Sequence, residues 1–276
     1  GCMTPVNIID GSSPVILAQP HGGTYLPSAE SDPSELLVTL NERGREMADT
    51  DWHIHRLYDG LLQDVTVVEA TFSRYLIDAN RDPSGSSLYP GQNTTELCPT
   101  IDFEGRPIYQ MEAEPDAVEI ETRRNNYHAV YHAALLAQIE RVRKLHGKVL
   151  LFDCHSIRSR LPFLFEGVLP DFNLGTNNTS TCDPIIEEAA LKVCANEKFA
   201  LHGYSYVING RFKGGWTTRH YGKPEKGIHA IQLELAQQTY MDESSPWLYR
   251  EEKAAKLRIH LKKLLNCLEK IITTLN

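Results

Sequence analysis

The chain has 276 residues, of which 41% are hydrophobic and 23% are charged, and its formal net charge is −8. This composition is typical of a globular protein with a substantial core. The negative charge gives no sign of the basic face that nucleic-acid binding favours, and the apolar runs are too short to span a membrane. The N-terminus has no basic segment followed by a long apolar one, so we expect no signal peptide and a cytoplasmic location.

Six cysteines are scattered along the chain without any C-x-x-C pair. A chain of this length does not need disulfides for stability, so we expect reduced thiols. Cys154 lies between Asp153 and His155, and on a strand its side chain would point to the opposite face from theirs. We therefore interpret Cys154 as a small core residue and not as a nucleophile.

Residues 14–19 predict a buried strand, which runs into Pro20-His21-Gly22-Gly23. The two glycines permit unusual backbone angles and let a ligand come close to His21. The alternative interpretation is a plain turn without a function.

Residues 34–47 have helical spacing, and the segment Asp49-Thr50-Asp51-Trp52-His53-Ile54-His55 follows. Two aspartates and two histidines in seven residues are typical of metal ligands. On a helix, Asp51 and His55 would share one face, as would Asp49 and His53. A solvated helix start would give the same pattern, because aspartates are favoured at a helix N-terminus.

Residues 65–70 predict another strand, and the segment after it carries Arg74 and Arg81. Guanidinium groups form bidentate pairs with carboxylates, so both arginines suit an acidic substrate. Structural ion pairs with Asp78 and Asp82 are the alternative. Residues 83–115 are rich in Pro, Gly, Ser and Thr and predict a long loop over one face, which at this length is more often functional than accidental.

Residues 116–145 form the longest helical pattern, closed by Gly147, and we expect structural positions for His128 and His132 within it. The apolar run 149–152 then predicts a central strand of a parallel sheet. Ligands bind at the carboxyl ends of such strands, where Asp153 and His155 lie. We expect Asp153 to orient His155, and a purely structural carboxylate is the alternative.

The last third of the chain predicts a loop over 166–183, a helix over 184–198 and a strand over 204–208. A glycine-framed polar loop over 211–222 is suited to substrate contact, and residues 228–235 alternate as a buried strand. Glu234 interrupts its apolar end, where a carboxylate is costly unless it is paired or functional. Ser245-Pro246 predicts the start of a C-terminal helix that covers the sheet. No linker divides the chain, so we expect one α/β domain over residues 1–276.

Three predicted strands thus end in polar residues, namely His21, His155 and Glu234. Two histidines and a carboxylate are typical of catalytic zinc, with the fourth position left to water. Zinc lowers the pKa of that water to about 7 and polarises a carbonyl. A further carboxylate then serves as general base, and arginines hold an acidic substrate. The residues therefore indicate a metal-dependent amide hydrolase.

In this combination and order, the motifs resemble the N-formylglutamate amidohydrolase family over nearly the whole chain. The matching motifs are Pro20-His21-Gly22-Gly23, Asp49-Thr50-Asp51-Trp52, Ser73-Arg74, Asp78-Ala79-Asn80-Arg81-Asp82, Asp153-Cys154-His155-Ser156, Thr218-Arg219-His220-Tyr221-Gly222 and Gln232-Leu233-Glu234. The family looks like a branch of the zinc carboxypeptidase-like hydrolases. The resemblance implies a three-layer α/β/α domain with a central mixed, largely parallel sheet.

The resemblance also implies roles for single residues. The larger group usually carries Glu three residues after the first histidine, where this chain has Thr24, so the carboxylate ligand must come from elsewhere. We choose Asp51, because Thr-Asp is the family's pattern, and keep Asp49 and His53 as alternatives. The implied set is one Zn²⁺ ion held by His21, Asp51 and His155, the base Glu234, and the substrate-binding residues Arg74, Asn80, Arg81 and Arg219.

The resemblance implies hydrolysis of N-formyl-L-glutamate to formate and L-glutamate, a late step of histidine degradation. One alternative keeps the chemistry and changes the substrate to another N-acyl amino acid or a peptide C-terminus. An alternative of another class is a protein that binds a metal or an amino acid without turnover. Such a protein would retain the arginines but would need no base.

Overall fold

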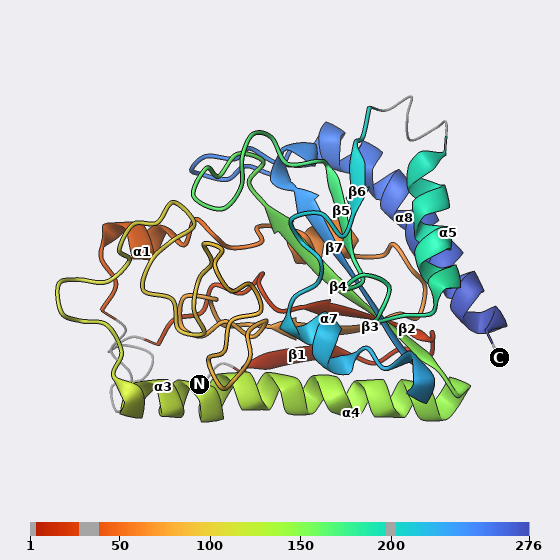
Figure 1. Cartoon of the computed structure of the whole chain (residues 1–276), viewed down its shortest axis with the longest axis horizontal. Coiled ribbons are helices and arrows are strands. Elements are labelled where there is room, and N and C mark those ends of the chain that lie inside the picture. The colour runs from red at the N-terminus through yellow and green to blue at the C-terminus, as the bar shows by residue number, and fades with distance from the viewer. Residues whose placement is uncertain (1–3, 28–38, 197–202, 276) are drawn as a thin grey trace.

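The computed structural model describes residues 4–27, 39–196 and 203–275. Seven strands form one sheet with the order β1-β3-β2-β4-β7-β5-β6 (Figure 1). The strands are β1 (Val6–Ile9), β2 (Val15–Gln19), β3 (Thr66–Ala70), β4 (Val149–Ile157), β5 (Phe172–Gly175), β6 (Tyr206–Ile208) and β7 (Ile228–Ala236). The central strands β3, β2, β4 and β7 are parallel, whereas β1 and β5 run antiparallel to β3 and β7. The predicted mixed, largely parallel sheet is confirmed.

Helices cover both faces of this sheet (Figure 1). One face carries a continuous helical rod made of α3 (Ala117–Arg123), the π-helical turn η1 (Arg124–His128) and α4 (Ala129–His146). The other face carries α2 (Ile54–Tyr58), α5 (Pro184–Ala195) and α8 (Glu251–Thr274). The result is the predicted three-layer arrangement. None of the helices within the described ranges is long and apolar enough to cross a bilayer.

The alternation of side chains along the central strands determines which residues lie on the same side of the sheet as α4. On β4, Phe152 and Cys154 belong to the core under α5 and α8, so Cys154 is a core residue as predicted. Leu151 belongs to the core under α4. Because the side-chain period of a strand is two, Asp153 and His155 continue the α4 side.

Strand β7 repeats this pattern beside β4. Ala230 belongs to the core under α4, and Gln232 and Glu234 follow on the same side of the strand. The parallel register pairs Asp153 with Gln232 and His155 with Glu234. The two central strands therefore change together from a packed core to a row of polar side chains.

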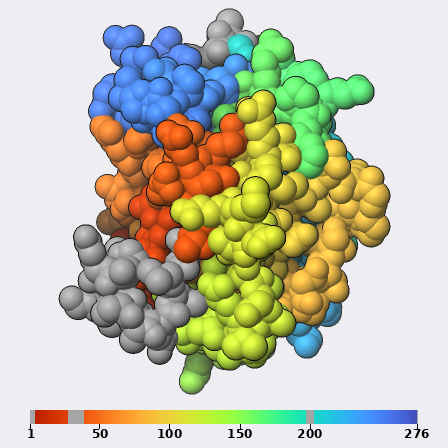
Figure 2. Space-filling model, turned by 90° about the vertical axis from the view of Figure 1, so that its left-hand side faces the viewer, coloured from red at the N-terminus to blue at the C-terminus, as the bar shows by residue number. Residues whose placement is uncertain are grey.

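Loops, and not long helices, cover the carboxyl ends of the central strands. They come from the stretch around α1 (Glu42–Glu46), the segment between β3 and α3, and the segments that follow β4 and β7. Figure 2 looks onto this side and shows these segments packed against one another. Between β3 and α3 there is no helix or strand apart from isolated bridges, which agrees with the long loop predicted over 83–115.

Two predictions for the first third of the chain are wrong in the described residues. The helix predicted over 34–47 is reduced to α1, because Leu40 forms a β-bridge with Tyr109 and only the following Asn41 caps a helix; residues 34–38 of that prediction lie outside the described ranges. The helix predicted to carry Asp51 begins only at Ile54. The backbone N–H of Asp51 donates to the carbonyl of His21 at 3.0 Å, which holds this stretch against the end of β2.

Three further predictions need correction. The predicted loop over 166–183 contains β5, which pairs with β7, and the predicted loop over 211–222 contains the short helix α7 (Trp216–Tyr221). The C-terminal helix starts at Glu251 and not at Pro246, because the preceding residues form a loop closed by a β-bridge between Met241 and Tyr249. Its predicted apolar face is right. That face is fully buried and consists of Leu257, Leu261, Leu264, Leu265, Leu268 and Ile272.

Candidate active site

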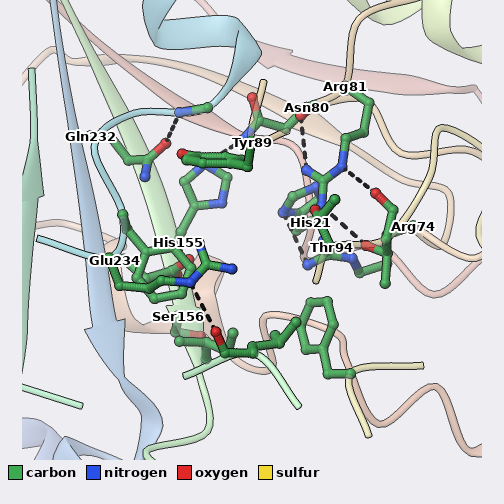
Figure 3. Close-up of a pocket in the computed structure, with 17 residues that line it drawn as sticks. His21, Arg74, Asn80, Arg81, Tyr89, Thr94, His155, Ser156, Gln232 and Glu234 are labelled. Atoms are coloured by element: carbon green, nitrogen blue, oxygen red, sulfur yellow. Dashed lines mark hydrogen bonds between the residues drawn. The ribbon is translucent and has the colours of Figure 1, made fainter. Parts of the chain in front are cut away.

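A cavity opens at the carboxyl ends of β2, β4 and β7. Its lining includes His21 from the end of β2, His155 from β4 and Glu234 from β7. In Figure 3, Glu234 and His155 enter the cavity from one side, and Arg74 and Arg81 lie on the other. The three strand ends that the sequence singled out therefore meet at one place.

Two histidines of this cavity lining and the buried Asp51 form a group that could hold a metal ion. One ligand atom each of His21, Asp51 and His155 lie within 4.8 Å of one another. The Oδ2 atom of Asp51 is 3.3 Å from Nδ1 of His155 and 3.8 Å from Nδ1 of His21. Two imidazoles and a carboxylate are a donor set that suits zinc and leaves one position open.

A second carboxylate contacts each of these histidines at Nε2, the ring nitrogen that does not approach Asp51. Nε2 of His21 is 2.5 Å from Oδ1 of Asp78, and Nε2 of His155 is 2.7 Å from Oδ2 of Asp153. An Nε2–H that donates to a carboxylate leaves Nδ1 as the acceptor nitrogen of the ring. Both Nδ1 atoms lie near Asp51, and Nδ1 of His21 also lies 3.2 Å from Nη1 of Arg74. Asp153 thus contacts His155 as the sequence predicted, whereas the partnership of Asp78 with His21 was not foreseen.

Glycine at position 22 brings Asp51 close to His21. A Cβ atom on Gly22 would lie 2.8 Å from a methyl group of Ile54, at the start of α2. The backbone hydrogen bond from Asp51 to His21 needs this close approach. The Pro-His-Gly-Gly segment is therefore a tight junction between β2 and the segment that carries Asp51, and not a free turn.

Asp49 and His53, the alternative metal ligands of the same segment, contact other parts of the protein. Asp49 accepts hydrogen bonds from the hydroxyl of Tyr75 at 2.6 Å and from Arg158 at 2.8 Å. His53 donates from Nε2 to the carbonyl of Trp247 at 2.6 Å. Neither belongs to the group of His21, Asp51 and His155.

Arg74 and Arg81 line the cavity and also form ion pairs with Asp78, one of the two aspartates that the sequence offered as structural partners. Arg74 donates to Oδ2 of Asp78 at 2.9 Å, and Nη1 of Arg81 lies 3.6 Å from the same oxygen. Arg81 further donates to the carbonyl and hydroxyl of Thr95. Asn80 also lines the cavity. Its backbone N–H donates to Asp78, and its side-chain oxygen accepts from the backbone N–H of Thr217.

Two histidines of the long helical rod support the Asn80–Arg81 segment. Nε2 of His128 donates to the carbonyl of Arg81 at 2.9 Å, and Nε2 of His132 donates to that of Ala79 at 2.6 Å. Both rings are buried, and burial lowers the pKa of His132 to about 3, so that ring is neutral at physiological pH. The structural positions predicted for His128 and His132 agree with these contacts.

Of the arginines chosen from the sequence, only Arg219 is not brought to the cavity. It lies on α7, donates to the carbonyl of Gly214 at 2.8 Å and sits over the ring of Tyr89. The cavity lining instead includes Arg211, from the segment before α7. Sequence reasoning marked this polar segment for substrate contact but did not single out Arg211.

The ionisable groups of the site differ in charge because their surroundings differ. Burial and Arg74 together lower the pKa of His21. Burial alone would also lower the pKa of His155, but Asp153 and Asp51 outweigh it and hold that pKa well above its ordinary value. In the metal-free protein His155 therefore carries a proton that a metal would displace.

Glu234 is the least compensated of these groups. Its side chain is buried, and Oε2 has no hydrogen-bond partner among the described residues. Burial raises the pKa of Glu234 to about 8, although the charge of His155 opposes the shift. A carboxylate with a raised pKa beside a metal site is typical of a general base.

Known proteins match this chain over most of its length. The family model for N-formylglutamate amidohydrolase matches residues 13–241. The chain belongs to the N-formylglutamate amidohydrolase family. The resemblance seen in the sequence motifs is thereby confirmed.

Two relatives are N-formylglutamate deformylases from Pseudomonas species. The one from Pseudomonas putida is 45% identical over 94% of this chain and 93% of the relative. The one from Pseudomonas aeruginosa is 44% identical over the same shares. A solved N-formylglutamate amidohydrolase from Ralstonia eutropha has a TM-score of 0.78 and 25% identity, covering 98% of both chains. A gene product of Agrobacterium tumefaciens, 18% identical with a TM-score of 0.70, shares the fold.

The raised pKa of Glu234 predicts how pH changes the stability of the metal-free protein. Between the ordinary value of 4.5 and about 8, the folded protein holds a proton that the unfolded chain has released. Stability therefore falls as pH rises through this window. Glu234→Gln removes this ionisation. We therefore expect the unfolding free energy of the variant, relative to that of wild type, to increase by roughly 2–4 kcal/mol as pH rises from 5 to 9.

Urea unfolding of both metal-free proteins at pH 5, 7 and 9 measures this difference. Glu69→Gln, on the partly exposed carboxylate that pairs with His55, serves as the control. A stability difference between Glu234→Gln and wild type that does not change with pH contradicts the raised pKa.

Proposed function

We propose that this protein hydrolyses N-formyl-L-glutamate to formate and L-glutamate, with one Zn²⁺ ion held by His21, Asp51 and His155. The observation that carries the proposal is one cavity whose lining includes the two histidines of this ligand group, Glu234 and the arginines. The names of the two Pseudomonas relatives support the substrate. The donor set and the two supporting carboxylates support the metal.

When bound, the ion supplies a Lewis acid that polarises the formyl carbonyl and lowers the pKa of water. Glu234 takes the proton of the attacking water and delivers it to the leaving nitrogen of glutamate. Its buried position on β7, beside His155 in the strand register, holds it at the ligand group. No other carboxylate of the cavity lining is available, since Glu234 is the sole acidic residue among the described residues that line it.

Asn80 and Arg81 bind the substrate carboxylate next to the scissile amide. Arg81 is held by Thr95 and Asp78, so its guanidinium keeps a fixed plane for a bidentate contact. Arg74 lies closest to the ligand group, with Nη1 3.2 Å from Nδ1 of His21. Its charge stabilises negative charge that develops on the formyl oxygen.

The proposed setting is the cytoplasm, where the reaction serves histidine degradation. All five cysteines in the described part of the chain are free, which fits a reducing compartment. The proposal involves a small-molecule substrate and no nucleic acid or membrane partner.

The first test replaces the proposed base. With zinc present, the wild-type protein is expected to release glutamate and formate from N-formyl-L-glutamate. Glu234→Gln is expected to lower kcat by about 10²–10⁴-fold with little change in KM, because the base acts on the proton and not on substrate binding. Glu69→Gln, on the partly exposed carboxylate that pairs with His55, is expected to retain the wild-type rate.

The measurement is release of free amino acid from a panel of N-formyl, N-acetyl and longer N-acyl amino acids. A near wild-type rate for Glu234→Gln would falsify the proposed mechanism. Preference for a longer acyl group favours the alternative deacylase. Absence of turnover with every member of the panel favours a binding protein.

The second test concerns the metal ligands. Asp51→Asn is expected to weaken zinc binding by more than the roughly 10–100-fold typical of residues that only support a ligand. His53→Gln and Asp49→Asn are expected to keep the metal, because both side chains contact other parts of the protein. Elemental analysis after dialysis and the shift of Tm on zinc addition report the difference. Loss of zinc from His53→Gln or Asp49→Asn, with retention by Asp51→Asn, contradicts the assignment.

A further inference from the structure

Arg211 differs from the other arginines of the cavity in having no acidic partner. Arg74 and Arg81 both lie beside Asp78, at 2.9 and 3.6 Å. In the described ranges 4–27, 39–196 and 203–275, no carboxylate lies within 4.0 Å of the Arg211 guanidinium. A half-buried cation without a counter-ion is unfavourable on its own, and an anionic ligand would relieve that cost.

The protein nevertheless holds this guanidinium in a defined place. Nε donates to the carbonyl of Leu164 at 3.0 Å, and Nη2 donates to that of Asn93 at 3.1 Å. The rings of Tyr89 and Phe212 lie 5.4 and 5.2 Å from its central carbon. These contacts fix the plane of the group, as cation–π contacts and rigid planar donors allow.

The contacts leave donors free. Among the described residues, Nη1 of Arg211 has no hydrogen-bond acceptor, and Nη2 has only the carbonyl of Asn93. At least two N–H groups are therefore available to the cavity that Arg211 lines. Burial and the nearby charge of Arg81 lower the pKa of Arg211, as expected for a cation without an acidic partner within ion-pair distance.

Apart from Arg74, which lies beside His21, the cavity thus holds two separately anchored cationic positions. Asn80 and Arg81 form one, fixed by Asp78 and Thr95, and Arg211 forms the other, fixed by Leu164 and Asn93. An N-acyl amino acid with a neutral side chain has one carboxylate and satisfies only one position. A dicarboxylic amino acid satisfies both.

We propose that Arg211 binds the side-chain carboxylate of the substrate and so selects acidic N-acyl amino acids over neutral ones. This inference rests on the proposed function and deepens it by assigning the second carboxylate. Arg211 is then a specificity residue, because it touches the substrate far from the reacting amide. Its effect should fall on KM for acidic substrates and not on the chemistry.

The test compares N-formyl-L-glutamate with N-formyl-L-glutamine, which has the same shape without the charge. The wild-type enzyme is expected to prefer the glutamate substrate by about 100-fold in kcat/KM, since a hydrogen-bonded charge pair is typically worth a few kcal/mol. Arg211→Gln is expected to abolish most of this preference by raising KM for the glutamate substrate. Its kcat/KM for the glutamine substrate is expected to stay within about threefold of the wild-type value. Arg211→Lys keeps the positive charge but lacks the planar pair of N–H donors of a guanidinium, and it is expected to retain part of the preference.

Arg219→Gln is the matched control. Arg219 contacts the same Tyr89 ring, with its central carbon 5.2 Å from the ring centroid, but does not line the cavity. Its variant is expected to keep the wild-type preference. Equal losses for both substrates in Arg211→Gln, or an unchanged preference, overturn the proposal.

Calorimetric binding of L-glutamate and L-glutamine separates this inference from the proposed function. If wild type hydrolyses neither formyl substrate, the proposed function fails, and the binding data still test Arg211. Wild type is then expected to bind L-glutamate more tightly than L-glutamine, and Arg211→Gln to bind both alike. Equal binding of the two amino acids by wild type, or discrimination that survives in Arg211→Gln, overturns the assignment.

Discussion

The buried carboxylate of Asp78 joins the parts of this site that come from different segments of the chain. It contacts Nε2 of His21 at 2.5 Å and the guanidinium groups of Arg74 and Arg81 at 2.9 and 3.6 Å. Burial would raise its pKa, but Arg81, His21 and Arg74 outweigh burial and hold the pKa of Asp78 well below its ordinary value. Such a carboxylate is acceptable inside a protein because each oxygen has charged or donor partners. One group thus sets both the tautomer of a candidate metal ligand and the positions of two arginines that we propose bind the substrate.

The central strands supply the other fixed part of the site. In β4 and β7 the side that packs under α4 becomes, a few residues later, the side that carries His155 and Glu234. Parallel pairing makes these two residues direct neighbours, so the candidate ligand and the candidate base are placed by backbone hydrogen bonds and not by loops. The loops over the carboxyl ends then add the groups that meet the substrate, as is common for α/β sheets.

Much of the sheet and of the candidate site could be predicted from the sequence, because the patterns that indicate them are local in the chain. Apolar runs ending in His21, His155 and Glu234 predicted the strands, and parallel strands bring their carboxyl ends together. Asp51 was harder, since no helix carries it and its place depends on a backbone contact with His21 that is remote in sequence. It was chosen through the family resemblance, because spacing alone left Asp49 and His53 open.

The sequence also could not show which arginine of the polar segment 211–222 lines the cavity. The segment over 211–222 was recognised as polar and suited to substrate contact, yet it contains the helix α7, which starts at Trp216. That helix carries Arg219 to the carbonyl of Gly214, whereas Arg211 precedes it and lines the cavity. Which of two nearby arginines lines the cavity depends on the six-residue helix α7, and no periodic pattern in the sequence predicts that helix.

X-ray absorption spectroscopy at the zinc edge tests the central claim most directly. Protein loaded with one equivalent of zinc is expected to hold one ion per chain, with two imidazole nitrogens and oxygen ligands and no sulfur. Zinc that is bound through cysteine sulfur, or that is not retained at one equivalent, would contradict the assignment of His21, Asp51 and His155 as the metal site.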